Sequence, residues 1–518
     1  MSEVARRLLP AGDRALLVEL PDLDAALGFF DAVRAAELPG VVEAVPAART
    51  VLVRYHPLLT DFAELAARLA ALTVTRGGFV EGSEVTIGVH YDGEDLAEVA
   101  ALLGVDERAV IAAHTSGHYR VAFGGFAPGF AYLSGGDPLL NVPRRQSPRT
   151  RIPAGAVALA GTFSAVYPRE SPGGWQLIGR TAEAMWNLDR EPPALLQPGD
   201  HVRFVEVGRH TGPAEPLPAH ATVDTLGPSP ALEILSLGAQ ALLQDEGRPG
   251  LAGLGVPASG ALDRLALHQA NRLVGNPSDA AVIEFAWGGT VRAVGDVVVA
   301  VSGERADVHR VHRDDRRTPV ADPAAVLLRD GESLAFRTVR GSRCYLAIRG
   351  GFQVSTVLGS RSSDVLSGIG PAPLIAGIHL PTGSGAGLPA VGDAEPWPDR
   401  LSGDEVHLPV LLGPRDDWFV DEAIRVLFGQ PWEVTEQSNR VGLRLRGDQP
   451  LDRRSRDELP SEGLVTGAVQ VPASGQPVLF LADHPVTGGY PVIAVVHSSA
   501  LDVAGQLAPG MTVRFAPA

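Results

Sequence analysis

The first part of the chain alternates between apolar runs and helical apolar spacing, and this pattern predicts a small α/β domain over residues 1–82. Strands are predicted where short apolar runs lie between turn residues, and helices where apolar residues recur every three or four positions. In chain order the predicted elements are strand 15–20, helix 23–37, strands 41–45 and 50–55, and helix 61–72. This β-α-β-β-α order suggests a split βαβ fold.

Beyond this domain the pattern changes to strands and turns. A strand at 84–91 precedes two short helices at 95–103 and 106–115, after which Gly and Pro recur at turn spacing and favour closed barrels. We predict a mainly β protein with an α/β N-terminal domain, divided into a barrel at 83–209, a linker at 210–230 and repeated barrels at 231–518. Because the linker is proline-rich and lacks apolar periodicity, we expect the two halves to be hinged.

Three short cassettes occur twice in the same order, which indicates a repeated β unit of roughly 100–130 residues. "PAGAVALAG", "SPGGWQLIG" and "LQPGDHVRF" begin at residues 153, 171 and 196, and their counterparts "VTGAVQVPA", "VTGGYPVIA" and "LAPGMTVRF" begin at residues 465, 486 and 507. The paired glycines at 173–174 and 488–489 are expected at turns or bulges that need a positive φ or a close backbone approach.

Composition excludes several functions. The formal net charge of −16 disfavours wholesale binding to nucleic acid or to an acidic membrane. The 518 residues contain no lysine, so a P-loop lysine, a Schiff base, a Ser-Ser-Lys amidase triad and covalent biotin on this chain are excluded. The single Cys344 cannot form an internal disulfide and fits a cytoplasmic location, and we predict neither an export signal nor a membrane-spanning helix.

Long motifs in both halves resemble one pair of bacterial proteins. "GGFAPGFAYL", "VPRRQSPRTRIPAGAVALAG" and "YPRESPGGWQLIGRT" in the first half resemble the B-type subunit of 5-oxoprolinase, which was also described as a sporulation-kinase inhibitor. The second half resembles the C-type subunit in "QDEGRPGLAGLGVPASGALDRLALHQANRLVGNPSDAAVIEF", "YLAIRGGF", "LGSRSSD", "SNRVGLRL" and "DHPVTGGYP". The chain is therefore similar to a fusion of the two, although Phe163 and Ser164 replace a Gln-Thr pair that is usual in relatives.

This resemblance implies cyclophilin-like barrels related to the carboxyltransferase region of urea carboxylase. It also implies a component of ATP-dependent 5-oxoprolinase, an ATP-hydrolysing amidohydrolase that opens 5-oxoproline to L-glutamate together with a separate A-type subunit. ATP, with or without Mg, is the expected cofactor. The common label "allophanate hydrolase subunit" does not fit, because authentic allophanate hydrolysis resembles amidase-signature chemistry that needs a lysine.

The sequence is also consistent with two other functions, and it leaves open whether the chain forms a homo-oligomer. One is a carboxyltransferase component that works with a biotin carrier supplied in trans. The other is a non-enzymatic regulator of a sensor histidine kinase, although covalent fusion would hold inhibitor and antagonist together permanently.

Polar residues on loops of the second half are candidates for a small-molecule site. Asp245 and Arg248 lie on a glycine-bounded turn and could orient a polar substrate, or they could simply pair to stabilise that turn. Asp263 and Asn271 are eight residues apart on a predicted helix and project on one face, and Ser259 is the predicted helix cap.

Three further motifs of the second half carry candidate residues. Arg361 and Asp364 lie in a hydroxyl-rich loop that could bind a carboxylate or phosphoryl group. His484 is a natural proton carrier near pH 7, although the preferred interpretation is that it hydrogen-bonds its own loop. We assign as candidate catalytic residues Asp245, Asp263, Asp483 and His484, and as candidate substrate-binding residues Arg248, Asn271, Arg361, Asp364, Asn439, Arg440 and Tyr490.

In the first half, a cluster of arginines and two aromatic residues could line an anion-binding wall. Its candidate members are Arg144, Arg149, Tyr167 and Trp175, and barrel packing explains the aromatic residues at least as well. No metal site is predicted, because the His-x-x-His at 309–312 follows no established zinc pattern.

Overall fold

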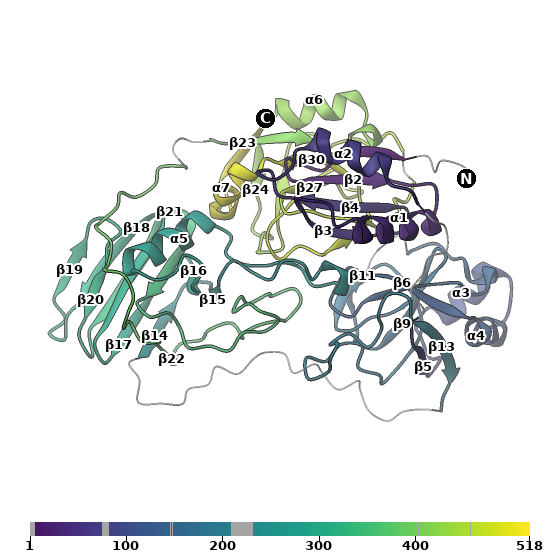
Figure 1. Ribbon diagram of the computed structural model, residues 1–518, viewed down its shortest axis with the longest axis horizontal. Coiled ribbons are helices and arrows are strands. Elements are labelled where there is room, and N and C mark those ends of the chain that lie inside the picture. The colour runs from purple at the N-terminus through teal and green to yellow at the C-terminus, as the bar shows by residue number, and fades with distance from the viewer. Residues whose placement is uncertain are drawn as a thin grey trace.

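The protein is mainly β, and its sheets are arranged in three lobes (Figure 1). The computed structural model describes residues 6–74, 82–145, 147, 149–208, 231–401, 403, 405–455 and 457–518. The predicted 210–230 linker lies outside this part of the chain. Among the described residues, no helix is both long enough and apolar enough to cross a bilayer.

The first domain is a four-stranded antiparallel sheet with two helices. Asp22 and Asp61 accept backbone N–H bonds at the starts of the two helices, as N-capping residues do. The elements are β1 (Arg7–Pro10), β2 (Ala15–Glu19), α1 (Leu23–Ala35), β3 (Val41–Pro46), β4 (Thr50–Tyr55) and α2 (Phe62–Ala71), in the sheet order β1-β2-β4-β3. All five predicted elements are confirmed, and β1 is an additional strand that the pattern did not predict.

The first barrel follows, with both predicted helices present. Its sheet order is β12-β9-β10-β7-β6-β13-β5, and an isolated bridge between His90 and Arg180 links the two outer strands. The elements are β5 (Glu84–Val89), α3 (Leu96–Leu103), α4 (Glu107–Ser116), β6 (Tyr119–Gly124), β7 (Ala131–Ser134), β8 (Arg149–Ile152), β9 (Ala156–Ala160), β10 (Phe163–Val166), β11 (Ser171–Gly173), β12 (Gln176–Arg180) and β13 (His201–Glu206).

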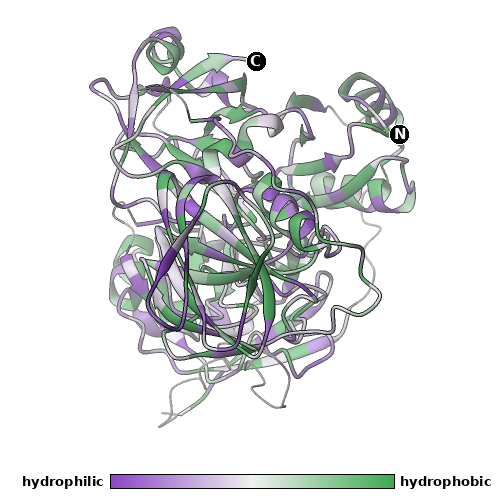
Figure 2. Ribbon diagram, turned by 90° about the vertical axis from the view of Figure 1, so that its left-hand side faces the viewer, coloured by the Kyte–Doolittle hydropathy of each residue, from purple (hydrophilic) through white to green (hydrophobic). Residues whose placement is uncertain are grey.

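The second half begins with a nine-stranded sheet, on which one helix packs. Figure 2 views this lobe end on and shows green, hydrophobic strands at its centre and purple, hydrophilic segments toward its edges. The elements are β14 (Ala231–Leu237), β15 (Gln240–Gln244), α5 (Arg264–Val274), β16 (Val282–Ala286), β17 (Gly288–Val294), β18 (Val297–Val311), β19 (Arg317–Val320), β20 (Val326–Leu328), β21 (Ser333–Ile348) and β22 (His379–Pro381).

The last barrel is closed and repeats the topology of the first. Its order β30-β27-β28-β25-β24-β31-β23 matches the first barrel position by position, including the parallel pair at its end, and β23–β30 pairing closes it. The elements are β23 (Glu405–Leu412), α6 (Asp421–Gly429), β24 (Trp432–Val434), β25 (Gly442–Arg446), β26 (Glu462–Gly463), β27 (Ala468–Gln470), β28 (Val478–Phe480), β29 (Thr487–Gly488), β30 (Val492–Val496), α7 (Leu501–Gln506) and β31 (Thr512–Pro517).

The two glycine-aromatic motifs occupy equivalent places in the two barrels. β11 pairs with β8 and β29 pairs with β26, each pair forming a separate two-stranded sheet. None of the four glycines has a positive φ. Close approach accounts for two of them instead, because a Cβ at Gly173 would collide with the Tyr167 hydroxyl and one at Gly488 would lie 2.7 Å from Leu464 Cδ1.

The first domain packs against the second half of the chain, so the halves meet directly. Six apolar residues of β1–β4 and the turns beside them form one buried cluster with Ala252 and Val486. Polar contacts also cross the boundary, including the bond from Phe126 N to Thr487 Oγ1 at 2.9 Å. A large and purely apolar interface would contradict hinge motion between the halves. This interface mixes apolar and polar contacts, so hinge motion stays a prediction.

A buried arginine connects the first domain to the last barrel. Arg415 is only 3% exposed, donates from Nε to both carboxylate oxygens of Glu462 at 3.0 Å, and reaches Glu19 of β2 at 3.1 Å. Burial raises the pKa of Glu462, and the positive charge of Arg415 opposes this shift. The pair is therefore a desolvated ion pair in which each charge needs the other.

We predict that Arg415→Met lowers the free energy of unfolding by about 3 kcal/mol, because it leaves the Glu462 carboxylate buried without its cation. Urea unfolding followed by tryptophan fluorescence measures the change. Arg425→Met is the matched control, since Arg425 pairs with Glu422 at the surface and should shift the free energy by less than about 0.5 kcal/mol. Equal losses in both variants would contradict the prediction.

Candidate functional site

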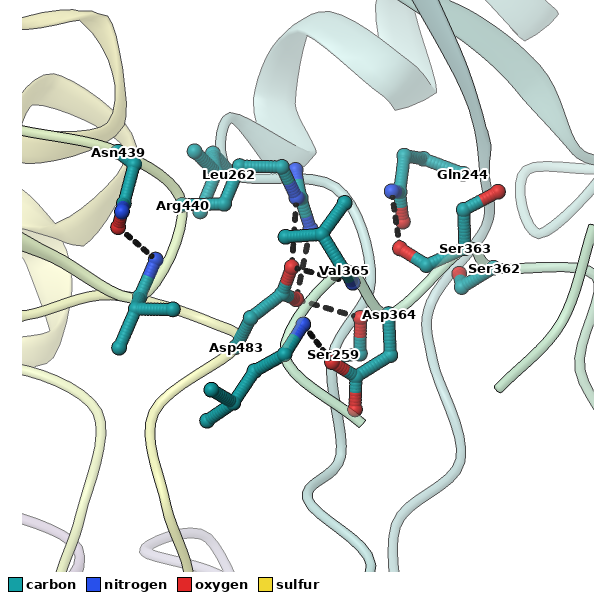
Figure 3. Close-up of polar contacts among 12 residues, drawn as sticks. Gln244, Ser259, Leu262, Ser362, Ser363, Asp364, Val365, Asn439, Arg440 and Asp483 are labelled. Carbon is teal, nitrogen blue, oxygen red and sulfur yellow. Dashed lines mark hydrogen bonds and ion pairs between the residues drawn. The ribbon is translucent and has the colours of Figure 1, made fainter. Parts of the chain in front are cut away.

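A buried polar network lies where the nine-stranded sheet meets the last barrel (Figure 3). Arg440 Nε and Nη2 donate to the two oxygens of Asp483 at 2.9 and 3.0 Å, and Nη1 donates to Glu284 Oε1 of β16 at 2.6 Å. Ser259 Oγ donates to Asp483 Oδ1 at 2.6 Å. Segments distant in sequence are thus held together by one guanidinium, and we call these four residues the Asp483 network.

Glu284 is stabilised as a carboxylate inside this network. Tyr345 of β21 donates its hydroxyl hydrogen to Glu284 Oε2 at 2.9 Å, and Arg343 Nε lies 3.3 Å from Oε1. Burial alone would raise the pKa of Glu284, but the charges of Arg440 and Arg343 outweigh it and hold that pKa below its usual value. Its charge is therefore committed to structure at neutral pH.

Asp245 organises the loop that carries Arg361 and Asp364. Its Oδ1 accepts from Gly247 N and from the hydroxyls of Ser360 and Ser362 at 2.9, 2.5 and 2.6 Å, and its Oδ2 accepts from Arg361 N at 2.6 Å. A carboxylate with four donors is a poor general base, because its lone pairs are occupied. The structure therefore gives Asp245 a role in shaping the loop.

Three buried polar atoms beside this loop lack a partner among the described residues: Arg248 Nη1, Asp364 Oδ2 and Arg169 Nη1. Arg248 and Asp364 are each 2% exposed. Arg169 reaches the loop from the first barrel, where its Nη1 lies against Gly368. The three residues, which we call the Asp364 cluster, therefore combine groups from both halves of the chain.

Electrostatics couple the members of this cluster. The pKa of Asp364 is raised to about 7, mainly by burial and next by the nearby charge of Asp483. The charge of Arg248 lowers this pKa, but by less than the charge of Asp483 raises it. Burial also lowers the pKa of Arg248 and of Arg169, and in each case the charge of Asp364 opposes the shift. A carboxyl that titrates near neutrality between two incompletely bonded guanidiniums can exchange a proton with a bound ligand.

A groove of about 330 Å³ opens beside the Asp483 network. Ser259, Leu262 and Ala482 line it from the second half, and Arg14 and Arg54 line it from the first domain. A separate cavity of about 30 Å³, close to the size of one water molecule, touches Arg248 and His484. The groove is large enough for a small-molecule substrate.

His484 is held in its neutral form. Burial lowers the pKa of its imidazole to about 4. Its Nδ1 lies 2.8 Å from the carbonyl oxygen of Pro485, which can only accept, so Nδ1 carries the proton and Nε2 the lone pair. The sequence left open a proton carrier or a loop-bonding residue, and this geometry favours the second interpretation.

Several other predicted residues have structural roles in the second half. Asp263, not Ser259, caps α5, and it also accepts from Arg400 and Gln506, so its carboxylate is fully used. Asn271 bonds the carbonyls of Ser278 and Ala280. The structure therefore brings Asp364 and Asp483 within electrostatic reach of Arg248, whereas Asp263 and Asn271 are bound to local structural partners.

The remaining three candidates of this half also point elsewhere. Arg361 directs Nε to the Val354 carbonyl at 2.6 Å. Asn439 is exposed and closes its own turn by accepting from Val441 N at 2.9 Å, which places it to one side of Asp483 in Figure 3. The Tyr490 ring is 38% exposed and stacks under Arg453.

The predicted anion-binding wall of the first half does not form. Arg149 makes a bidentate pair with Asp95 at 2.7 and 2.8 Å, and Arg144 pairs with Glu458 at 2.9 Å, so both positive charges are neutralised. Tyr167 and Trp175 lie in an apolar cluster of the first barrel. Within the described residues, no group of three or more His, Cys, Asp or Glu side chains is arranged to hold a metal ion.

Arg169 is the residue of the Asp364 cluster that sequence reasoning missed. It lies within the "YPRESPGGWQLIGRT" motif, so its motif membership was the available signal. Nothing in a single sequence, however, places it beside Asp364, because the two residues belong to different lobes and different halves.

We predict that protonation of Asp364 makes stability depend on pH. Since its folded pKa is about 7 and its usual value is 3.8, the folded protein keeps a proton that the unfolded chain releases, and stability falls as pH rises from about 4 to 7. Asp364→Asn should remove this part of the pH dependence. The free energy of unfolding of the variant minus that of the parent should therefore be larger at pH 8 than at pH 5, by a few kilocalories per mole. The conversion is about 1.4 kcal/mol for each pKa unit.

Urea unfolding of the parent and the variant at the two pH values measures this difference. Asp279→Asn, at an exposed position, is the control and should leave the slope unchanged. Parallel pH profiles for the parent and Asp364→Asn would show that Asp364 is ionised in the folded protein across the whole range.

Comparison with known proteins accounts for nearly the whole chain. The family described as "Carboxyltransferase domain, subdomain A and B" matches residues 254–517, and "Carboxyltransferase domain, subdomain C and D" matches residues 6–196. The chain is 35% identical to the C-type subunit of 5-oxoprolinase from Escherichia coli K12 over 289 residues, which are 55% of this chain and 90% of that protein. It is 42% identical to the B-type subunit of 5-oxoprolinase from Escherichia coli O157:H7 over 178 residues, which are 33% of this chain and 81% of that protein.

Solved structures agree with this assignment. The crystal structure of TTHA0988 superposes with a TM-score of 0.83 at 36% identity and covers 97% of this chain and 99% of that one. By sequence, the urea amidolyase of Lachancea kluyveri is 31% identical over 55% of this chain, which corresponds to 17% of that protein. The chain therefore belongs to the carboxyltransferase-domain family, as a fused homologue of the B-type and C-type subunits of 5-oxoprolinase.

Proposed function

We propose that this protein is a component of an ATP-dependent 5-oxoprolinase that opens 5-oxoproline to L-glutamate together with a separate A-type subunit. The observation that carries the proposal is the similarity of one polypeptide to both the B-type and the C-type subunits, over most of each relative's length. Both relatives are named as 5-oxoprolinase subunits, which supports a partner that supplies the rest of the enzyme.

In this proposal the Asp364 cluster binds a cyclic amide that carries a carboxylate. Arg248 lines the cavity of about 30 Å³, whereas no member of the cluster lines the groove of about 330 Å³. Arg248 and Arg169 each keep an N–H group free for an anion, and a guanidinium binds a carboxylate with strong, directional hydrogen bonds. Asp364, with a pKa near 7, can accept a proton from attacking water and return it to the ring nitrogen that leaves. We therefore assign substrate binding to the arginines and proton transfer to Asp364.

ATP would supply activation of the amide oxygen, which makes the carbonyl carbon open to attack by water. The chain offers no lysine for a P-loop, so it does not fit that common mode of phosphate binding. In this proposal ATP and Mg bind at residues supplied wholly or partly by the A-type subunit.

A second candidate function is carboxyl transfer with a biotin carrier supplied in trans. The two carboxyltransferase family matches and the similarity to urea amidolyase favour it. With this function, the groove would receive a carrier-bound biotin, and turnover would require a carrier protein and bicarbonate instead of 5-oxoproline.

We predict 5-oxoproline-dependent ATP hydrolysis when this protein is mixed with an A-type subunit of 5-oxoprolinase, and formation of glutamate in equal amount. Phosphate and glutamate are measured with each protein alone, with both together, and without 5-oxoproline. Activity that needs both proteins and 5-oxoproline supports the proposal, whereas turnover only with a biotin carrier and bicarbonate would favour the second candidate.

In the same assay, Arg248→Gln should raise KM for 5-oxoproline roughly tenfold, because a charged hydrogen bond to the carboxylate is lost. Asp364→Asn should lower kcat about 100-fold with a smaller change in KM, as loss of a general acid–base does. Arg203→Gln, on the surface of the first barrel, is the matched control and should change neither parameter. Unchanged kinetics in both test variants would remove the Asp364 cluster from the reaction.

A further inference from the structure

A second cavity, which shares no lining residue with the groove, lies at the place where three parts of the molecule meet. Its volume is about 430 Å³, and it is lined by residues of the first domain, the first barrel and the last barrel. The first domain contributes the start of α1 and the β3–β4 turn, the first barrel contributes the β9–β10 hairpin, and the last barrel contributes residues 458–461. No contact of the Asp483 network or the Asp364 cluster described above uses its lining.

One side of this cavity is apolar and aromatic. Phe163 lies edge-on to Tyr132 with ring centroids 5.6 Å apart, and Leu23, Ala160 and Leu459 line the same space. Tyr132 is fixed in position, because its hydroxyl lies 3.2 Å from Ser461 Oγ of the last barrel. The wall is therefore rigid and suits the face or edge of a flat ring.

The charged residues of the lining are two arginines and two carboxylates, and Arg49 is the arginine whose guanidinium has no partner among the described residues. Arg144 is neutralised by Glu458, and the Asp22 carboxylate accepts from Ala25 N at the positive end of α1. Arg49 also lines the cavity, it is exposed, and its guanidinium has no hydrogen bond or ion pair with any described residue. Asn141 adds a side-chain amide that is likewise without a bond in the described part of the chain.

We propose that this cavity, which we call the Arg49 pocket, binds a small anionic ligand with a flat, ring-sized apolar body. The ring would lie against Phe163 and Tyr132, and a carboxylate or phosphate group would face Arg49 and Asn141. The volume fits such a molecule, since small-ligand pockets usually measure about 300–1,000 Å³. The proposal is independent of the 5-oxoprolinase function, because it rests on different residues.

The location of the Arg49 pocket means that a bound ligand would affect how the parts of the molecule are held together. Because the walls belong to three parts of the molecule, an occupant would contact all three at once and favour the arrangement in which they meet. Binding should therefore raise the free energy of unfolding of the chain, by an amount that depends on the ratio of the ligand concentration to Kd. No single lobe presents the complete pocket.

The test uses the full chain and 8-anilinonaphthalene-1-sulfonate, a fluorescent probe with a flat apolar body and one anionic group. Titration should give saturable binding with one site per chain. Arg49→Gln should weaken it roughly tenfold, the equivalent of about 1.4 kcal/mol for a lost charged contact. Thr162→Trp, which places an indole in the pocket from an exposed hairpin position, should abolish it.

Two controls separate the pocket from adventitious dye binding. Arg203→Gln removes an exposed arginine elsewhere and should leave the Kd unchanged, and thermal melts should give the same Tm for all three variants without dye. Competition with adenosine monophosphate and with phenylacetate distinguishes a phosphate from a carboxylate as the preferred anion. Binding of equal affinity in the parent, Arg49→Gln and Thr162→Trp would overturn the proposal.

Discussion

The buried guanidinium of Arg440 is the interaction on which the second half of the molecule depends. A charge that is only 2% exposed is tolerated only when it is fully paired, because the free energy of removing it from water is large. Arg440 meets this requirement with Asp483 of the last barrel and Glu284 of the nine-stranded sheet. Satisfying one charge therefore fixes the position of the barrel relative to the sheet, beside the groove that Ser259 lines.

The same solution recurs at other contacts between segments. Arg415 connects the last barrel to β2, and Arg400 connects the chain before β23 to Asp263 at the start of α5. Every cation in this chain other than histidine and the N-terminus is an arginine, whose planar fork can donate to two or three acceptors at once. Polar contacts between distant segments are thus geometrically specific. If one partner is lost, the other charge stays buried without a counter-charge.

Against this background the Asp364 cluster is unusual, because its polar groups are buried but incompletely bonded. Asp245, Asp263 and Asp483 all have donors for their lone pairs, whereas Asp364 Oδ2 has none among the described residues. Buried unsatisfied groups lower stability and are therefore expected where a ligand completes them. This contrast distinguishes a candidate binding site from the structural carboxylates around it.

The sequence alone determined the class of fold, the order of elements in the first domain and the repeated barrel, because these follow from local hydrophobic periodicity and from turn residues. It also supplied the motifs that carry the family, and with them Arg248 and Asp364. Only the tertiary structure decided that Asp263 caps a helix, that Arg149 is neutralised by Asp95, and that Arg169 lies beside Asp364. Those outcomes depend on pairings between residues that are distant along the chain, and the identity of a polar residue does not specify which partner satisfies it.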